Sequence, residues 1–449
     1  VIEAMTDTPN GVVLTIDANT SVTFEGLTVD DFRTTTDAWV NVSGTAEGSP
    51  AGGTFIYTAG ADNFVGDVGD DTFIGGSIVA GGVHTVGAAD QADGGLGDDR
   101  FEVILQNNTI IPNLTDIETV SAQALGGAPS LVNLVNAGDV ETLVNDRSTA
   151  LLNFTNVQAP VNVVVNEATG NTNVRFANNA DNNGAATQSV EFNSTSSITT
   201  FDYLSGGAPT TLEAVFNNSN GAGVNFFGNV GDSVTTVDLE LNGSPFNITG
   251  GPGGTLNGVN GTGGLASLML SGSADVTSAR ANSNDIFNDV TNVDATGLTG
   301  TLMLDQLNAD TGMTFLGGNA QTTVVASNAL GANNDVTFGT DDNDRLVQSA
   351  TNLNGFDSAT DTGGSADIWE VHHTGGATID YSGGPLLAAA NNTSGFENLV
   401  VDVWDNTSEN VLIDNGLLGG DFDAIIIQDT FSEAGGPLGA GDVDADVNN

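Results

Sequence analysis

The sequence contains no cysteine and no lysine, and each absence excludes a class of protein. Without cysteine no disulfide can stabilise the fold, so stability has to come from size, repetition or bound metal. Six arginines stand against 57 acids, which gives a formal net charge of −51. Proteins that bind nucleic acid or anionic lipid depend on Lys and Arg. We therefore expect neither nucleic acid nor a bare anionic membrane as a partner.

Long apolar runs and helix signals are missing as well. No stretch approaches the ~20 apolar residues of a membrane-spanning helix, so no transmembrane segment is expected. No stretch combines a helical apolar period with helix caps, and only 6% of the residues are aromatic. The chain does not open with a secretory signal. We expect that an exported form has lost a leader or carries its address near the C-terminus.

Acidic residues, glycine, asparagine and threonine are abundant in the sequence. Hydrophobic residues make up 39%, which is too many for a disordered polyanion, so the chain can bury a core. A folded body with so much uncompensated negative charge repels itself. Divalent cations relieve this repulsion best, because each ion bound between carboxylates removes two charges and adds bonds.

Short strand-like runs occur along the whole chain, separated by Asn-Gly, Gly-Gly and Asp-Asn turn pairs. They predict an all-β protein. The clearest runs are Gly11–Ile16, Val161–Val165, Thr235–Leu241, Leu399–Val403 and Ala424–Ile427.

A weak repeat of the form apolar-x-x-apolar-x-(apolar or small) recurs at irregular spacing. In a β-solenoid each such string would be one strand of one coil, with its apolar residues inward. We therefore predict an elongated body of the β-solenoid or β-roll type, and the alternative is that portions of the chain are β-sandwiches. The strings start at Leu114, Val140, Phe154, Ile198, Val234, Leu265, Val290 and Phe396.

Motif content divides the chain into three expected segments. Residues 1–105 hold strands and a Gly/Asp-rich segment, and residues 106–330 carry most of the weak repeats. Residues 331–449 hold a second acidic segment and the final strands.

The strongest local signal is the run Gly94–Glu102, GGLGDDRFE. It matches the nonapeptide GGxGxDxUx, in which U is a large apolar residue, at every fixed position. Glycines permit tight turns that aim backbone carbonyls and the Asp carboxylate at a shared cation. These hard oxygen ligands are the ones that Ca²⁺ accepts.

Two further units precede this run, in register with each other. Gly66–Ile74 matches except for Asp67 at the second glycine position, and Gly60–Phe64 supplies the later half of another unit. Asp62 and Asp71, which fill the same position in these units, are nine residues apart.

These units resemble the RTX calcium-binding repeats of bacterial proteins exported by type I secretion. The resemblance covers only residues 60–102. It implies a parallel β-roll that holds calcium between successive turns, folding after export, and a place outside the cell or at the cell surface. The Thr/Asn/Gly-rich strands around the units also resemble RTX-type surface-layer proteins of Gram-negative bacteria, in style rather than through a motif.

Two later segments, Gly339–Leu346 and Asp361–Asp367, echo the unit without its full glycine pattern. The adjacent His372 and His373 would point to opposite faces of a strand, so we expect both to be solvent or packing residues. The candidate calcium ligands are Gly60, Asp62, Gly66, Gly69, Asp71, Gly94, Gly95, Gly97, Asp99, Asp341, Asp344 and Asp367.

Three classes of function compete. An enzyme would be a β-helical polysaccharide lyase, epimerase or hydrolase, but lyases usually hold acidic sugar with Lys or Arg, and the six arginines lie far apart in the sequence. A paired-carboxylate glycosidase stays open, because 57 acids always contain some pair, yet nothing raises one pair above the rest. We therefore expect no enzymatic activity. A calcium-stiffened adhesin or stalk is the second interpretation.

The sequence favours a calcium-dependent structural protein of the bacterial cell surface that assembles with its own copies into a surface layer, sheath or extracellular filament. Exposed strand edges could pair between subunits, and calcium could bridge their like-charged faces. Cell-envelope polysaccharide is a further expected partner.

Overall fold

A computed structural model describes most of the chain. Its described residues are 5–8, 11–17, 20–25, 52–76, 84–177, 187–203, 209–227, 233–249, 255–257, 265–278, 290–309, 313–328, 334–341, 343–350, 353, 358–373, 378–403, 410–414, 418, 422–428 and 444–448.

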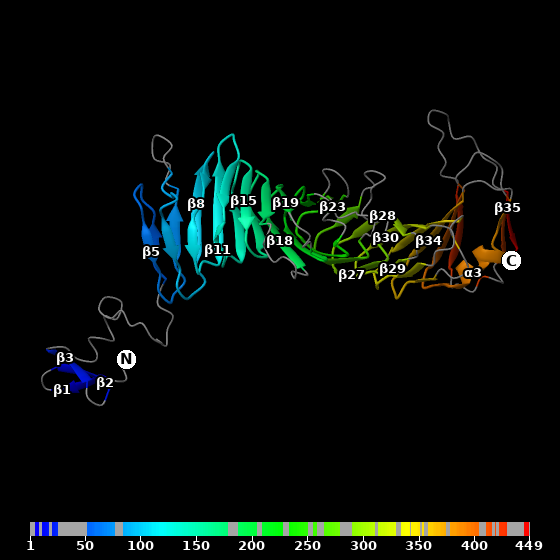
Figure 1. Cartoon of the computed structure of the whole chain (residues 1–449). Coiled ribbons are helices and arrows are strands. Elements are labelled where there is room, and N and C mark those ends of the chain that lie inside the picture. The colour runs from blue at the N-terminus through cyan, green and yellow to red at the C-terminus, as the bar shows by residue number, and fades with distance from the viewer. Residues whose placement is uncertain are drawn as a thin grey trace.

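One long parallel sheet of 15 strands runs through the body of the molecule. Its strands are stacked side by side along a single axis (Figure 1). In chain order they are β4 (Thr54–Ile56), β6 (Thr72–Gly75), β8 (Arg100–Gln106), β11 (Thr119–Leu125), β14 (Thr142–Asp146), β16 (Asn162–Asn166), β18 (Thr187–Asn193), β20 (Thr211–Asn217), β22 (Thr236–Asn242), β25 (Ser267–Gly272), β27 (Asn292–Leu298), β29 (Met313–Leu316), β31 (Asn334–Thr337), β33 (Ser358–Thr360) and β36 (Thr393–Ser394).

Four shorter parallel sheets complete the coils, and we call them the first to fourth side sheets. The first comprises β5 (Asn63–Val65), β7 (Gln91–Asp93), β10 (Asn113–Thr115) and β13 (Asn136–Ala137). The second comprises β9 (Thr109–Ile110), β12 (Ser130–Asn133), β15 (Leu152–Val157), β17 (Thr172–Phe176), β19 (Ile198–Asp202), β21 (Gly223–Phe226) and β24 (Leu256–Asn257). The third comprises β23 (Phe246–Ile248), β26 (Val276–Ser278), β28 (Leu302–Ala309), β30 (Thr322–Asn328), β32 (Arg345–Ser349), β34 (Ile368–His373), β37 (Asn398–Val403) and β39 (Ala424–Gln428). The fourth comprises β35 (Thr378–Asp380), β38 (Asn410–Asp414) and β40 (Asp444–Asn448).

The strands belong to a parallel β-solenoid, which confirms the predicted fold class. Neighbouring strands of the long sheet are one coil apart, and the coil length varies from 18 residues (Thr54 paired with Thr72) to 34 (Ala359 paired with Thr393). Antiparallel pairing among the described strands is confined to β1 (Met5–Thr8), β2 (Gly11–Asp17) and β3 (Thr20–Glu25).

The strings of the weak repeat lie at strands of the coils, but not at one string per coil as predicted, because the strings at Val140 and Phe154 lead into β14 and β15 of the same coil. The strings that start at Val234, Leu265 and Val290 lead into β22, β25 and β27, which are consecutive paired strands of the long sheet. The strings at Phe154 and Ile198 instead contribute to β15 and β19 of the second side sheet. The irregular spacing therefore has two causes: the coils differ in length, and the strings lie on different faces.

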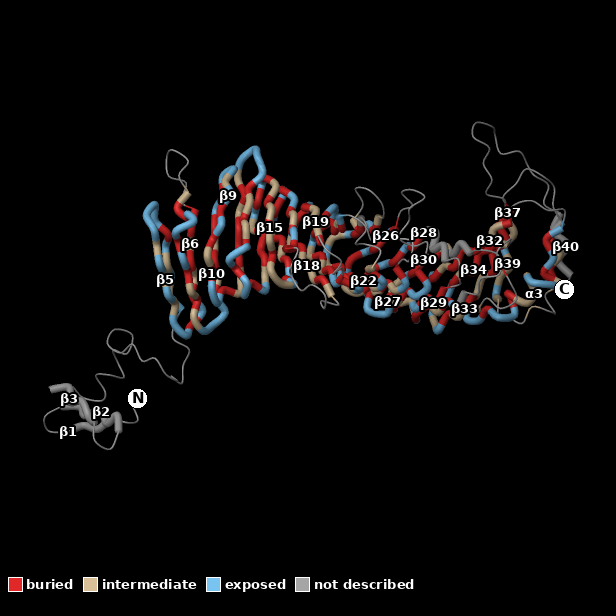
Figure 2. Tube along the Cα trace, viewed as in Figure 1, coloured by how far each residue is buried: buried red, intermediate tan, exposed pale blue. Residues whose placement is uncertain are grey.

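The core is a continuous stack of apolar side chains inside the coils. Buried residues alternate with less buried ones along many strands, for example β18, and Figure 2 shows buried residues along the whole stack of coils. Aromatic rings stack from coil to coil, for example Phe192 on Phe216 with 4.8 Å between the ring centroids. Since parallel strands repeat about every 4.8 Å, equivalent side chains of successive coils come into direct contact.

This same repeat explains why asparagine is so frequent. At the ends of four consecutive strands of the long sheet, the side-chain amides of Asn166, Asn193, Asn217 and Asn242 form a ladder. The Nδ2 of each of the last three donates to the Oδ1 of the asparagine one coil earlier, at 2.8–3.0 Å. A ladder of amides satisfies donors and acceptors that would otherwise be costly at this half-buried edge.

Helical structure is sparse. The described residues contain the short helix α3 (Gly384–Asn391). Within the part of the chain that the structure describes, no helix has the length and apolar character of a membrane span. Strand pairing runs across the expected segment boundaries, and the three-segment division stays a prediction.

Candidate metal centre

The nonapeptide run lies in a turn between the first side sheet and the long sheet. The turn 94–99 connects β7 to β8, and one coil earlier the turn 66–71 connects β5 to β6. The two turns stack because their flanking strands pair in register. The next turn along the stack is also close, because a Cβ on Gly94 would lie 2.0 Å from the carbonyl oxygen of Asp116 in the next coil. The stacked turns therefore leave no room for a side chain at this position. The predicted ligands that this stack brings together are Gly66, Gly69, Asp71, Gly94, Gly95, Gly97 and Asp99.

Acidic side chains form a ladder along this corner, which we call the first ladder. The main-chain N–H of Asp71 donates to Asp99 Oδ1 at 2.6 Å, and the N–H of Asp99 donates to Glu118 Oε2 at 2.7 Å. Asp71 and Asp99 are each only 1% exposed, and Asp99 Oδ2 is buried with no hydrogen-bond partner. Burial, and then the charges of Asp71 and Glu118, raise the pKa of the Asp99 carboxyl.

Gly60 and Asp62 lie at the opposite corner of the coil. β5 belongs to the first side sheet and β6 to the long sheet, so a step of nine residues crosses from one face to the other. At this corner the N–H of Asp62 donates to Asp90 Oδ1 at 2.8 Å, and Asp62 Oδ2 accepts the N–H of Thr58 at 2.7 Å. The predicted N-terminal ligands therefore occupy two corners rather than one.

A second ladder lies at the corner between the long sheet and the third side sheet. The N–H of Thr322 donates to Asp344 Oδ1 at 2.6 Å, and the N–H of Asp344 donates to Asp367 Oδ1 at 2.7 Å. The N–H of Asp367 then donates to Glu397 Oε2 at 2.8 Å. As in the first ladder, each acid immediately precedes a strand, here β32, β34 and β37.

The second ladder differs from the first because another carboxylate joins it. One carboxylate oxygen from each of Asp344, Asp361 and Asp367 lies within 4.8 Å of the other two, and we call these residues the aspartate cluster. They are 0%, 5% and 0% exposed. Burial, followed by the charge of Asp367, raises the pKa of both Asp344 and Asp361 to about 7.

Two of the three predicted C-terminal ligands belong to this cluster. Asp344 and Asp367 do; the Asp341 side chain does not, and its main-chain oxygen faces Gly364 of the next coil. Asp361 enters the cluster although the sequence interpretation did not choose it. It begins the second echo segment, which Asp367 ends, so placing the two acids of that segment together would have found it.

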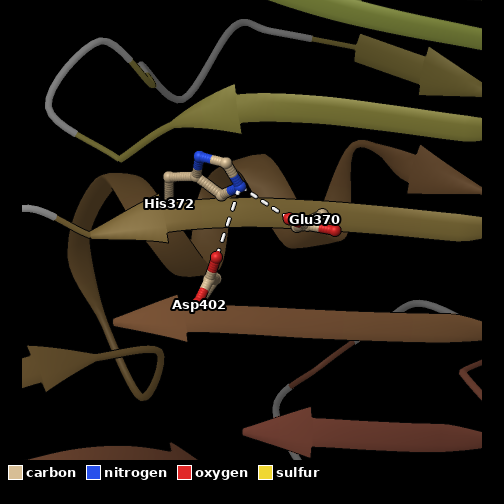
Figure 3. A group of neighbouring side chains, drawn as sticks. All are labelled: Glu370, His372 and Asp402. Atoms are coloured by element: carbon tan, nitrogen blue, oxygen red, sulfur yellow. Dashed lines mark hydrogen bonds and ion pairs between the residues drawn. The ribbon is translucent and has the colours of Figure 1, made fainter. Parts of the chain in front are cut away.

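A further group combines Glu370 and His372 of β34 with Asp402 of β37 (Figure 3). His372 Nε2 lies 2.6 Å from Glu370 Oε1 and 3.5 Å from Asp402 Oδ2. Glu370 also forms an ion pair with Arg345. Burial raises the pKa of Glu370, but hydrogen bonds from His372 and Arg345 outweigh it and hold the pKa below its usual value. The negative charge of Glu370 is therefore already compensated by Arg345 and by hydrogen bonds.

The sequence interpretation missed this group. His372 and Asp402 face each other because β34 pairs with β37 thirty residues later, and a variable coil length hides such partners. His373 points the other way, as the alternation along a strand requires. It is buried and shares a 3.1 Å hydrogen bond with the Tyr381 hydroxyl.

The two ladders and the aspartate cluster offer carboxylate oxygens, which suit hard cations such as Ca²⁺. The fit is best at the aspartate cluster, where Asp344 Oδ2 and Asp361 Oδ2 are both buried with no hydrogen-bond partner. At the first ladder, Asp99 Oδ2 is the corresponding atom.

Comparison with known proteins adds no family. No protein-family model matches the chain, and no curated protein matches it.

Proposed function

We propose that this chain is a calcium-dependent structural protein of the bacterial cell surface, a subunit that assembles with its own copies into a surface layer, sheath or filament. The observation that carries the proposal is the stacking of buried carboxylates at the corners of a continuous solenoid. Such a stack is costly unless cations are bound, because buried like charges repel and lose their hydration.

Charge supports the calcium requirement. In the described residues the ion pairs of arginine are made with other acids: Arg345, which follows Asp344 in sequence, pairs with Glu370. Arg100, which follows Asp99, pairs with Glu102. Neither ladder therefore gains its counter-charge from the neighbouring arginine, and divalent ions are the ready alternative.

Exposed edges support self-assembly. β4 is the first strand of the long sheet and β39 the last described strand of the third side sheet. Each carries a large apolar side chain that faces solvent: Ile56 is 65% exposed and Ile426 is 43% exposed. Apolar edge strands are templates for pairing with another chain. Contacts between opposite ends of a rod are head-to-tail, and head-to-tail contacts generate open filaments or arrays.

A groove favours the second interpretation, an adhesin. It has a volume of about 360 Å³ and lies on the outer face of the second side sheet. Its wall includes the exposed ring of Phe227 and the ion pair of Arg175 with Asp202, at 2.8 Å. A ring beside planar hydrogen-bonding groups suits a sugar, so binding of cell-envelope polysaccharide there would favour an adhesive or anchoring role.

The test is a calcium titration of the full chain from an EGTA-stripped start, with Mg²⁺ as the control. Circular dichroism follows folding, light scattering follows assembly, and electron microscopy identifies ordered particles. Calcium-induced β signal followed by ordered particles supports the proposal. A chain that folds with calcium but stays monomeric at high concentration contradicts assembly and favours the adhesin. No response in either signal contradicts the calcium requirement itself.

A further inference from the structure

We propose that the aspartate cluster binds one Ca²⁺ that joins two successive coils of the solenoid, with Asp344, Asp361 and Asp367 as its carboxylate ligands. The proposal shares with the proposed function the premise that the chain binds calcium, but it does not depend on assembly. It departs from the RTX-like corner in its ligand set, since Asp361 takes part here and a glycine, Gly66, begins the corresponding turn of the first ladder.

The distances between the carboxylates suit one Ca²⁺. Ca²⁺ holds oxygen ligands at about 2.3–2.6 Å, so two ligands of one ion are at most about 5 Å apart. One oxygen from each member of the cluster lies within 4.8 Å of the other two. The three oxygens are therefore close enough together to be ligands of a single ion.

Two carboxylate oxygens of the cluster are buried without a hydrogen-bond partner, which is an observation separate from the clustering. Asp344 Oδ1 already accepts the N–H of Thr322, and Asp361 Oδ1 accepts the N–H of Gly363. The other oxygen of each, Oδ2, is buried and has no hydrogen-bond partner. Buried carboxylate oxygens without a partner are rare in folded proteins and call for an unseen ligand such as an ion.

Gly364 leaves space beside the oxygens of the cluster. Gly364 adopts φ +111°, and a Cβ built on it would lie 2.9 Å from Asp367 Oδ2 and 2.2 Å from the carbonyl oxygen of Asp341. Glycine thus keeps side-chain atoms away from the oxygens of the cluster. It also keeps the main-chain oxygen of Asp341 close to the same turn.

The donor set favours Ca²⁺ among the common metals. All three groups are carboxylates, whereas structural zinc prefers thiolate and imidazole ligands. Mg²⁺ retains several waters and demands a small octahedral shell, which a site of three buried carboxylates accommodates poorly. Three carboxylates that ionise together around a bound ion also give a divalent ion a strong electrostatic advantage over Na⁺ or K⁺.

The bound ion would fix the N-terminal ends of two neighbouring strands of the third side sheet, β32 and β34. Asp344 immediately precedes β32, and Asp361 and Asp367 enclose the turn that leads into β34. An ion held between them fixes the register of these two strands, which pair along Arg345–Ser349.

Calcium binding to the full chain tests the site, measured by isothermal titration and by competition with a chelator, with Mg²⁺ alone as the comparison. We expect D344N and D361N each to bind one Ca²⁺ fewer than the natural chain, or to bind that ion about tenfold or more weaker. The control D335N removes a carboxylate from the exposed face of β31 and should leave the stoichiometry unchanged. Unchanged stoichiometry and affinity in both cluster variants would overturn the proposal.

Hydrogen exchange of the unsubstituted chain guards against variants that fail to fold. Calcium should slow the exchange of the β32 and β34 amides by about tenfold or more, because the ion suppresses local opening. Protection elsewhere without protection in these strands overturns the site, even if the chain assembles. Protection in these strands without assembly leaves the site standing and counts against the proposed function alone.

Discussion

The main-chain N–H of Asp344 donates to the carboxylate Oδ1 of Asp367 at 2.7 Å, across one coil of the solenoid. Asp71 and Asp99 have the same relationship at 2.6 Å, at a different corner and with a different coil length. One rule therefore operates at both places: the acid that ends a turn caps the backbone of the acid one coil earlier. The rule uses one oxygen of each carboxylate and leaves the other for a second partner.

Neutralising Asp99 should have opposite effects with and without calcium. Because burial and neighbouring charges raise the pKa of Asp99, its ionised form is unfavourable in the metal-free fold. We expect D99N to stabilise the EGTA-treated chain by about 1 kcal/mol and to reduce the stabilisation that calcium provides. Thermal melts with and without Ca²⁺ measure both effects.

D98N is the matched control for this prediction, because Asp98 is the exposed neighbour of Asp99. Equal calcium responses in D98N and D99N would mean that Asp99 has no special place in binding the ion.

Replacing Gly94 by alanine should be strongly destabilising. The new Cβ would lie 2.0 Å from the main-chain oxygen of Asp116, so the two coils would have to separate. We expect a loss of about 1–3 kcal/mol or more, observed as a lower urea midpoint. Gly127 has no atoms within 4 Å of the equivalent position, and G127A should change stability by less than about 0.5 kcal/mol. Similar losses in both variants would contradict the steric explanation.

Removing one member of the asparagine ladder should break two bonds at once. Asn217 donates to Asn193 and accepts from Asn242. We expect N217A to cost about 1–2 kcal/mol in urea unfolding. The exposed Asn292, on β27 of the same sheet, is the comparison, and N292A should have a much smaller effect. A ladder that contributes nothing would give equal midpoints for the two variants.

Lowering the pH should destabilise the fold partly through the protonation of His373. Burial, and then the nearby His372, lower the pKa of His373 from 6.5 to about 4. As the pH falls from 6.5 towards 4, the unfolded chain protonates this side chain and the folded chain does not, so stability is lost in that window. We expect H373Q to lose less stability than the natural chain between about pH 7 and pH 4.5 in thermal melts. Parallel pH profiles for the two chains would show that His373 plays no part.

A lysine on the edge strand β39 should block assembly. Ile426 is exposed on the last described strand of the third side sheet, and edge lysines oppose pairing between chains. We expect I426K to fold with calcium but to form fewer or shorter particles in light scattering and electron microscopy. M303K is the control, since Met303 is 49% exposed on β28, an interior strand of the same sheet. Assembly lost in both would point to lateral contacts instead.

The sequence predicts the strands well, because turn pairs and β-branched runs are local signals. The predicted run Thr235–Leu241 is β22 (Thr236–Asn242), and Ala424–Ile427 lies within β39. Coil pairing is much harder to predict, because a coil can be 18 or 34 residues long. No spacing rule could therefore have placed Glu118 after Asp99.

The same difficulty limits the candidate sites. Asp344 and Asp367 are predicted ligands because their segments echo the nonapeptide unit, and both belong to the aspartate cluster. Asp361 follows β33 and begins a turn instead of ending one, so it becomes a candidate only when the two acids of its segment are placed together. The group of Glu370, His372 and Asp402 depends on pairing between β34 and β37, which no local pattern encodes.

The unequal coil lengths have a consequence for how such a rod can evolve. A coil has only to return its strand to the same register, and each coil advances the axis by about 4.8 Å whatever its number of residues. The length of the rod is therefore set by the number of coils and not by the number of amino acids. Residues added within a coil change the outline and the surface chemistry, while the distance between the two ends of the subunit stays constant.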